Sequence, residues 1–385
     1  MRNPKNIESL KSGWRRVKFG DVVRLSKARC ADPLAEGVER YVGLEHLEPG
    51  DLRIRNWGNV VDGVTFTSVF RPGQVLFGKR RAYQRKVAVA DFSGVCSGDI
   101  YVMETKDAQV LLPELLPFIC QTDAFFDHAV GTSAGSLSPR TNWTSLSDFD
   151  FLLPPIKEQL RIAGVLNEIE SNSDQLISLA ESCASLIDAT FQHYVWSDES
   201  LNQKPINQIA EINPKVSSLS EEEPFIPMEA VDPWTQQIDL SRIEKKGQRG
   251  GVKAHGGDIL MARITPCLEN GKISQVPVSI QKCGGSTEFI VFRAQSGVDQ
   301  QFLYHLITSR VFHSQAAGTM SGSTGRQRAS AGDIGRILVP ILPLAKQKMI
   351  NDLIKRISEI KEATNSRLLR LNQMKLAVLN VVGRT

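Results

Sequence analysis

The sequence predicts an α+β protein made of two tandem copies of a mixed, strand-rich domain, each followed by one long helix. Two observations predict this fold: a repeat that runs through all 385 residues, and two segments in which apolar side chains recur at heptad spacing. The composition, 41% hydrophobic and 23% charged, is typical of a globular protein. The expected division is one domain at 1–155, a helix at 156–197, a second domain at 198–343 and a second helix at 344–385.

The repeat is clearest in two loops. GTSAGSLSPR begins at Gly131 and GTMSGSTGRQR begins at Gly318, and each leads into an apolar run, a proline and a glutamine. Other landmarks recur at offsets of 184 to 189 residues: VKFGDVVRL with KPINQIAEI, YVGLEHLEPGDL with FIPMEAVDPWTQ, RPGQVLFGKR with HGGDILMARI, and SGDIYVM with STEFIVF. Matches that keep their order over the whole length indicate a tandem duplication.

Each domain consists of short β-branched and aromatic runs separated by Gly, Pro, Asn and Asp, which is typical of short strands joined by turns. The first long helix is expected to begin just after Pro154 and Pro155, because proline suits the first turn of a helix. If this segment is helical to Trp196, it is about 60 Å long at ~1.5 Å per residue. Its heptad positions are Ile162, Leu166, Ile169, Ser173, Leu176, Ala180, Cys183, Ile187, Thr190 and Tyr194.

The second long helix is expected to follow Pro343. Its heptad positions are Leu353, Ile357, Ile360, Thr364, Arg367, Leu371, Met374, Val378 and Val381. Residues 157–196 hold 6 acidic and 2 basic side chains, whereas 346–385 hold 3 acidic and 9 basic ones. This charge difference favours an antiparallel coiled coil of the two helices, with the domains related by a pseudo-two-fold axis. The alternative is that each helix packs only on its own domain.

Several catalytic site classes are disfavoured. The six cysteines and six histidines are scattered, without the spacing of a metal site, and the cysteines are expected to be reduced packing residues. Gly271-Lys272 lacks the upstream glycine of a phosphate-binding loop, because Pro266 stands in its place. VDPW at 231 lacks the second proline of an amino-methyltransferase motif. The polar start and the absence of a long apolar run predict a cytoplasmic protein.

Basic loops indicate a polyanion as the binding partner. GKRRAYQRK gathers five cations around a tyrosine with no acidic residue, and both GT loops combine glycines, hydroxyls and arginines, which suit contact with phosphates and base edges. The candidate DNA-binding residues in the first domain are Lys79, Arg80, Arg81, Tyr83, Arg85, Lys86, Ser133, Ser136 and Arg140. Those in the second are Arg249, Lys253, Arg263, Lys272, Ser321, Ser323, Thr324, Arg326 and Arg328.

These features together resemble the specificity (S) subunit of a Type I restriction–modification system. The residues that carry the resemblance are the two domain-plus-helix repeats, the two GT loops, LPPIKEQLRI with LPLAKQKMI, and ARITPCLENGK. The resemblance implies two target-recognition domains that each read one half of a bipartite double-stranded DNA sequence, with the helices as a spacer. Half-sites one helical turn apart lie about 34–36 Å from centre to centre.

The resemblance also implies a non-catalytic chain without a cofactor of its own. Methylation would belong to two modification subunits that use S-adenosylmethionine, and cleavage to restriction subunits that use ATP and Mg²⁺. Two alternatives stay open: a DNA-modifying enzyme complete in one chain, and a coiled-coil scaffold that reads no bases.

Overall fold

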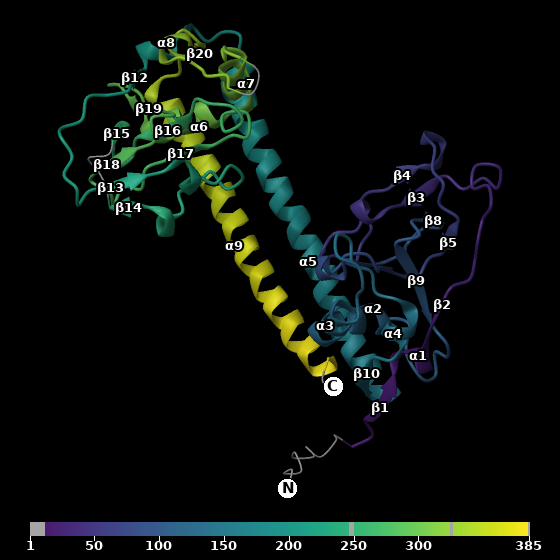
Figure 1. Ribbon diagram of the computed structural model, residues 1–385. Coiled ribbons are helices and arrows are strands. Elements are labelled where there is room, and N and C mark those ends of the chain that lie inside the picture. The colour runs from purple at the N-terminus through teal and green to yellow at the C-terminus, as the bar shows by residue number, and fades with distance from the viewer. Residues whose placement is uncertain (1–11, 246–249, 324–325, 384–385) are drawn as a thin grey trace. The chain divides into compact units, whose positions relative to one another are not determined.

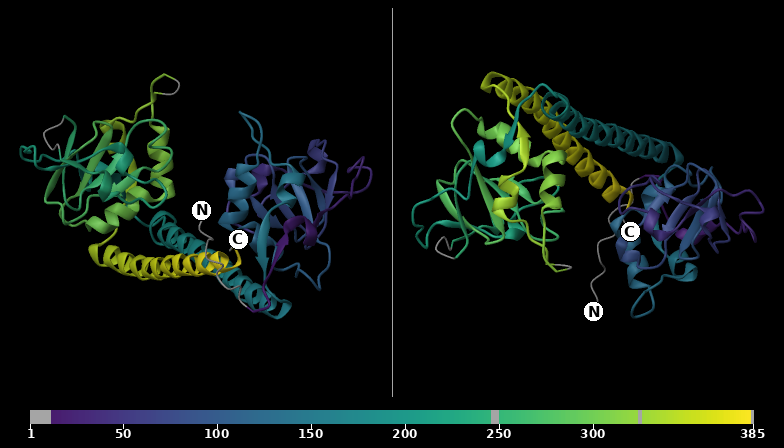
Figure 2. Two further views of the ribbon diagram at one scale, coloured as in Figure 1. Left: turned by 60° about the horizontal axis from the view of Figure 1, so that its bottom comes forward. Right: turned by 90° about the horizontal axis from the view of Figure 1, so that it is seen from above.

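The protein has the predicted α+β fold, in which two strand-rich units are joined by two long helices. The computed structural model describes residues 12–245, 250–323 and 326–383. The chain divides into two compact units, Met1–Ile177 with Ser366–Thr385, and Ser178–Asn365. Helices α5 (Ile156–Phe191) and α9 (Leu344–Val382) each pass without a break from one unit into the other (Figures 1 and 2).

In its described residues, the first unit is built on three small sheets. Its strands are β1 (Arg15–Lys18), β2 (Val23–Leu25), β3 (Arg40–Val42), β4 (Gly58–Asn59), β5 (Ser68–Phe70), β6 (Val75–Gly78), β7 (Val87–Val89), β8 (Gly94–Cys96), β9 (Ile100–Thr105) and β10 (Asp150–Leu153). The sheet orders are β2-β9-β6-β7, β4-β3-β8-β5 and β1-β10. All pairs are antiparallel except β3 with β8.

The part of the second unit that the structure describes has the same three sheets. Its strands are β11 (Gln203–Pro205), β12 (Ala210–Ile212), β13 (Pro224–Ile226), β14 (Glu244–Lys245), β15 (Val252–His255), β16 (Ile259–Ala262), β17 (Ile273–Gln275), β18 (Lys282–Gly285), β19 (Phe289–Ala294) and β20 (Leu338–Pro340). The orders are β12-β19-β16-β17, β14-β13-β18-β15 and β11-β20, again with one parallel pair, β13 with β18. The repeat in the sequence is therefore a repeat of the fold.

Short helices cover the sheets of each unit. They are α1 (Phe19–Val22), α2 (Leu116–Cys120), α3 (Asp123–Gly131) and α4 (Trp143–Ser147) in the first, and α6 (Gln300–Thr308), α7 (Arg310–Gly318) and α8 (Ala331–Gly335) in the second. The caps also repeat: the Thr122 hydroxyl accepts from the N–H of Phe125 at the start of α3, and the Ser309 hydroxyl accepts from the N–H of Phe312 at the start of α7. Such caps satisfy the unpaired N–H groups of a first turn.

The start of each long helix is fixed by a buried glutamine. In the first unit, the Gln159 side chain, 1% exposed, accepts from the N–H of Leu112 at 2.9 Å and donates to the carbonyls of Val110 and Pro154 at 2.9 and 2.8 Å. In the second, Gln347 accepts from the N–H of Asp299 at 2.8 Å and donates to the Leu342 carbonyl at 2.8 Å. Buried main-chain polar groups need such partners, which explains the glutamine in both copies.

The predicted heptad stripe of α5 is buried or half-buried along its length. Ile162, Leu166 and Ile169 are fully covered, and Leu176 and Ile187 are half-buried. The α-helix ends at Phe191 and continues as one turn of π-helix, η4 (Gln192–Trp196).

The predicted stripe of α9 is wrong in part. Leu353 and Ile360 are 38% and 52% exposed, and Arg367 and Met374 are exposed too, whereas Ile357, Leu371 and Val378 are covered. The covered stripe, also in heptad spacing, is Gln347, Ile350, Ile354, Ile357, Lys361, Thr364, Leu368, Leu371, Lys375, Val378 and Val382. The helix has apolar residues in two heptad registers, and the register that is buried includes two lysines, whose long apolar stems can be covered while the charge finds a partner.

Within the first unit, the early part of α5 packs with the late part of α9, so the two helices run antiparallel there. Ile162 and Leu166 share one core with Leu379 and Val382. Glu170 and Lys375 form an ion pair at 2.6 Å, which joins the acidic helix to the basic one.

In the second unit, the late part of α5 meets the early part of α9. Phe191 shares a core with Ile350 and Ile354, and Ile187 packs against it. Both cores also contain sheet and short-helix residues, such as Phe77 and Phe125 in the first unit and Phe292 and Phe302 in the second. Each long helix therefore packs on the other long helix and also on the adjacent sheets. The two arrangements expected from the sequence, a coiled coil and packing of each helix on its own domain, are both present in part.

The cysteines are free thiols, and only Cys267 among them is partly exposed. Burial raises the pKa of Cys96 and of Cys283 to about 12, so both stay protonated at neutral pH. Among the residues that the structure describes, no helix is long and apolar enough to cross a membrane.

Candidate nucleic-acid interface

In the first unit, the arginine-rich segment after β6 lies against the GT loop. The N–H of Arg81 donates to the Pro139 carbonyl at 2.7 Å, and the N–H of Thr141 donates to the Lys79 carbonyl at 3.0 Å. Arg80 and Arg140 face each other in an isolated antiparallel bridge. Two sequence motifs that are about 60 residues apart therefore form one surface.

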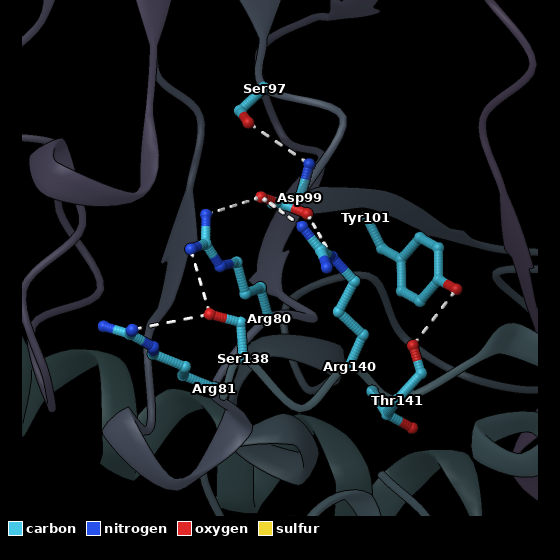
Figure 3. Close-up of polar contacts among 8 residues, drawn as sticks. All are labelled: Arg80, Arg81, Ser97, Asp99, Tyr101, Ser138, Arg140 and Thr141. Carbon is cyan, nitrogen blue, oxygen red and sulfur yellow. Dashed lines mark hydrogen bonds and ion pairs between the residues drawn. The ribbon is translucent and has the colours of Figure 1, made fainter. Parts of the chain in front are cut away.

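The side chains at this surface converge on one carboxylate, as Figure 3 shows. Asp99 accepts from Arg140 Nε at 2.8 Å and from Arg80 Nη1 at 3.3 Å. The Ser138 hydroxyl accepts from Arg80 Nη2 at 3.1 Å and from Arg81 Nη2 at 3.4 Å. We call Asp99, Arg80, Arg81, Ser138 and Arg140 the first node.

The second unit repeats this arrangement. Glu288 accepts from Arg328 Nε at 3.0 Å and from Arg328 Nη2 at 2.8 Å. Ile264 and Arg328 form the isolated bridge that Arg80 and Arg140 form in the first unit. The N–H of Ala329 donates to the Arg263 carbonyl at 2.8 Å, as Thr141 does to Lys79. We call Glu288 and Arg328 the second node.

The shared hydrogen bonds show which residues of the two GT loops correspond. Ala134 and Arg140 exchange N–H and carbonyl bonds at 3.0 Å each, and Ser321 and Arg328 do so at 3.1 and 2.9 Å. Arg140 therefore corresponds to Arg328, whereas an ungapped alignment of the two loops from Gly131 and Gly318 places Gln327 opposite Arg140.

Each GT loop also contains a glycine in the same backbone conformation. Gly135 has φ +111° and Gly322 has φ +131°, a region that side-chain-bearing residues rarely adopt. The glycine that recurs in the two loops is therefore needed to turn the chain.

The other DNA-binding candidates in GKRRAYQRK do not take part in the first node. Lys79 lies over the Tyr101 ring, with Nζ 4.7 Å from its centroid, and Tyr83 is 56% exposed. Arg85 donates to the Asp123 carboxylate at 2.6 Å. Lys86 donates to the Leu44 carbonyl at 2.7 Å. The cluster that looks purely basic in the sequence is thus divided between several acidic and main-chain partners.

The second unit contains a counterpart of the Lys86 contact. Lys272 donates to the Met228 carbonyl at 3.0 Å. Leu44 and Met228 are the first residues of equivalent 3₁₀ turns, η1 (Leu44–His46) and η6 (Met228–Ala230). Both lysines therefore hold a turn of their own domain.

The remaining candidates are spread over the loops and one strand. Ser133 donates to the Ala129 carbonyl at 2.7 Å and thereby caps the end of α3. The exposed ones are Ser136 in the first unit and Lys253, Ser321, Ser323 and Arg326 in the second. Arg263 is half-buried, and its Nε has no hydrogen-bond partner among the described residues. Arg249 and Thr324 lie outside the described residues.

Asp99 and Glu288 are central to the nodes, yet sequence reasoning missed them. Each stands directly before the long central strand of its sheet, β9 or β19, in the repeated SGDIYVM and STEFIVF segments. An acid at the same place in both copies is a usable signal, but a search for basic clusters passes over it.

Ion pairing holds both nodes in their charged forms. The Arg140 guanidinium is the main cause that lowers the pKa of the Asp99 carboxyl, and Arg328 lowers the pKa of Glu288 in the same way. Asp99 in turn raises the pKa of Arg140. Within the described part of the chain, no group of three or more His, Cys, Asp or Glu side chains could hold a metal ion.

The chain is similar in sequence to known proteins. The model of one family, described as "Type I restriction modification DNA specificity domain", matches residues 200–373. The chain is 27% identical over 181 residues to the Type I restriction enzyme EcoDI specificity subunit of Escherichia coli, covering 46% of this chain and 38% of that subunit. It is 31% identical over 153 residues to the EcoEI specificity subunit of the same organism, covering 38% of this chain and 25% of that subunit. The chain thus spans well under half the length of these curated relatives.

Solved structures match over nearly the whole chain. The S subunit of a Type I restriction–modification system from M. genitalium superposes with a TM-score of 0.61 at 14% identity, covering 96% of both chains. A chain from a structure that concerns complex assembly and conformational transition of the type I R-M system has a TM-score of 0.58 at 16% identity, covering 97% of this chain and 98% of that one. At these identities the structural likeness shows the fold alone. Residues 200–373 are thus similar in sequence to the Type I restriction modification DNA specificity domain, and the whole chain is similar in fold to solved S subunits of Type I systems.

Proposed function

We propose that this chain is the specificity subunit of a Type I restriction–modification complex, and that each unit reads one half of a bipartite target in double-stranded DNA. The observation that carries the proposal is the duplicated node, which presents Arg140 and Arg328 at equivalent places in two units of one topology. Arginine donors at base edges supply sequence choice, whereas contacts with phosphates set register and affinity. A fold repeated twice with different loop sequences suits a target with two different halves.

The chain directs chemistry that its partners perform. Two modification subunits that use S-adenosylmethionine would methylate the target, and restriction subunits that use ATP and Mg²⁺ would cleave DNA. The family match over residues 200–373 supports this division of labour, since its description is that of a DNA specificity domain.

The long helices set the spacing of the two half-sites. Because α5 and α9 each belong to both units, a heptad inserted into both helices is expected to change the number of unspecified base pairs in the target.

The test is to co-express the full chain with its methyltransferase partner and to select bound duplexes from a random library. The expected result is a motif of two short specified elements separated by a fixed number of unspecified base pairs. A single contiguous element, or no motif at all, would overturn the proposal. A second measurement gives the purified chain alone S-adenosylmethionine and mixed DNA, where methyl transfer without partners would identify a single-chain enzyme instead.

A further inference from the structure

We infer that Asp99 and Glu288 are positioning residues that determine specificity, because each carboxylate fixes one arginine, Arg140 or Arg328, as a donor to a base edge. The inference rests on the proposed function and deepens it, since it names the residue pair in each unit that decides one position of the target.

The two pairs have the same geometry. Asp99 accepts from Nε and Nη2 of Arg140 at 2.8 and 3.4 Å, and Glu288 accepts from Nε and Nη2 of Arg328 at 3.0 and 2.8 Å. The acid thus takes the same edge of the guanidinium in both units (Figure 3 for the first). Among the described residues, Nη1 of neither arginine has a hydrogen-bond partner. The arginine side chains remain 50% and 45% exposed.

The acids are themselves held by the sheet. The N–H of Asp99 donates to the Ser97 hydroxyl at 3.2 Å, and the N–H of Glu288 donates to the Ser286 hydroxyl at 3.3 Å. The Asp99 carbonyl accepts from the N–H of Lys79 at 2.9 Å, and the Glu288 carbonyl accepts from the N–H of Arg263 at 2.9 Å. A donor fixed through a rigid strand loses little conformational freedom on binding, so it is preorganised for one geometry.

The carboxylate also favours a base over a phosphate as the partner of the arginine. A phosphate contact depends on net positive charge, which the neighbouring acid reduces. A base contact depends on the direction of the N–H donors, which the acid fixes, and guanine O6 and N7 are the acceptors that arginine reads most often in the major groove. The arginines that pair with an acid therefore suit contact with base edges. Cations without an acidic partner suit contact with the phosphates of the DNA backbone.

The two nodes differ in one respect that can be measured. Asp99 also accepts from Arg80 at 3.3 Å, whereas Ile264 occupies the equivalent place in the second unit. Removal of the charge of Asp99 therefore removes the ion pairs of two guanidinium groups, and removal of the charge of Glu288 removes the ion pair of one.

The experiment compares the Asp99→Asn and Glu288→Gln variants of the full chain, each co-expressed with the methyltransferase partner. The probes are the duplex selected by the wild-type complex, its single-base-pair variants and a scrambled duplex. Asp99→Asn is expected to reduce discrimination at a base pair of one half-site by roughly tenfold or more, and Glu288→Gln to do so in the other half-site only. Affinity for the scrambled duplex should rise in both variants, and its log–log salt slope should steepen by about 0.9 for each guanidinium that gains a phosphate.

The control is Glu104→Gln, which removes the same charge from the other end of β9. Glu104 pairs with Arg24 at 2.8 Å, outside the node, so discrimination should stay at the wild-type level. Asp99→Glu replaces the aspartate with the glutamate that the second unit has at this place. This variant should keep most of the wild-type discrimination between base pairs. Unchanged discrimination in Asp99→Asn would overturn the inference, as would an equal loss of affinity for the selected and scrambled duplexes, which is the result of a damaged fold. A wild-type complex that selects no motif would instead refute the proposed function.

Discussion

The two units have the same topology, but the contacts between the sheet domain and the long helices differ between them. In the first, Asp174 on α5 forms ion pairs with Arg53 and Arg55, at 2.6 Å each, and Lys375 on α9 donates to the Gly50 carbonyl at 3.2 Å. In the second, Phe191 and Val195 pack in the apolar core, Asp188 on α5 pairs with Arg310 at 3.0 Å, and Asn351 on α9 donates to Asp299 at 2.7 Å.

The loop that carries Gly50 also differs between the units. Its counterpart in the second unit carries Trp234, which is 91% exposed. This loop therefore contacts a long helix in the first unit, whereas the Trp234 side chain of its counterpart is largely exposed.

The features that both copies keep are mainly those that bind the main chain. Gln159 and Gln347, Lys86 and Lys272, and the capping hydroxyls all pair with backbone N–H or carbonyl groups. These groups need partners whatever side chains surround them, whereas a charged contact between side chains can be replaced by an apolar one of similar shape. The comparison shows that the side chains that both copies keep are mainly those that satisfy main-chain hydrogen-bonding groups.

The largest predicted effect is that of the buried glutamines. Gln159→Leu and Gln347→Leu each leave an N–H and at least one carbonyl without a partner, and each should lower the free energy of unfolding by about 2–3 kcal/mol. Urea unfolding with hydrogen exchange should localise the first loss to the first unit and the second to the second unit. Wild-type stability in either variant would contradict a shared role for this residue.

The next effect concerns only the charged attachment. Asp174→Asn should lower the stability of the first unit by about 1–2 kcal/mol, because Asp174 is only 18% exposed and faces two arginines. Salt should weaken the wild-type attachment more than that of the variant. The matched control is Asp188→Asn, which breaks an ion pair with the exposed Arg310 and should cost under about 0.5 kcal/mol. An equal loss of stability in Asp174→Asn and Asp188→Asn would contradict the claim that charged contacts stabilise the first unit more than the second.

A third prediction concerns the stability of the second unit at acidic pH. Burial lowers the pKa of His305 to about 4, with Asp299 partly opposing the shift. The folded state therefore binds fewer protons than the unfolded state between pH 4 and 6.5, and stability should fall by about 2 kcal/mol as pH drops from 7 to 5. The equivalent residue of the first unit is Phe118, which does not titrate. His305→Phe should abolish this part of the pH dependence in thermal unfolding, and an unchanged pH profile would refute the assignment.

The smallest effect should distinguish structure from DNA contact. Lys86→Met and Lys272→Met each remove a hydrogen bond to the first carbonyl of a 3₁₀ turn, at a cost of about 0.5–1.5 kcal/mol. If these lysines only hold the turns, the salt slope of DNA binding stays at the wild-type value. A slope that falls by about 0.9 would instead show a phosphate contact, as their sequence context suggests.

The sequence predicts much of the fold because the repeat and the α5 stripe are local patterns. The α9 register fails because Lys361 and Lys375 look like surface residues, whereas their stems are covered and Lys375 pairs with Glu170 across the helices. The candidate site fails in a similar way: Arg80 and Arg140 are visible as basic residues, but the carboxylate that joins them comes from a different strand. Pairing across a fold needs the topology, which single-sequence patterns do not contain.

The central claim is that the two units read the two halves of one target independently. The most direct measurement replaces residues 1–155 with the corresponding domain of a relative that selects a different motif, and determines the new motif by selection from random duplexes. The account predicts that one half of the motif changes to that of the relative while the other half stays the same. A change in both halves, or in neither, would contradict it.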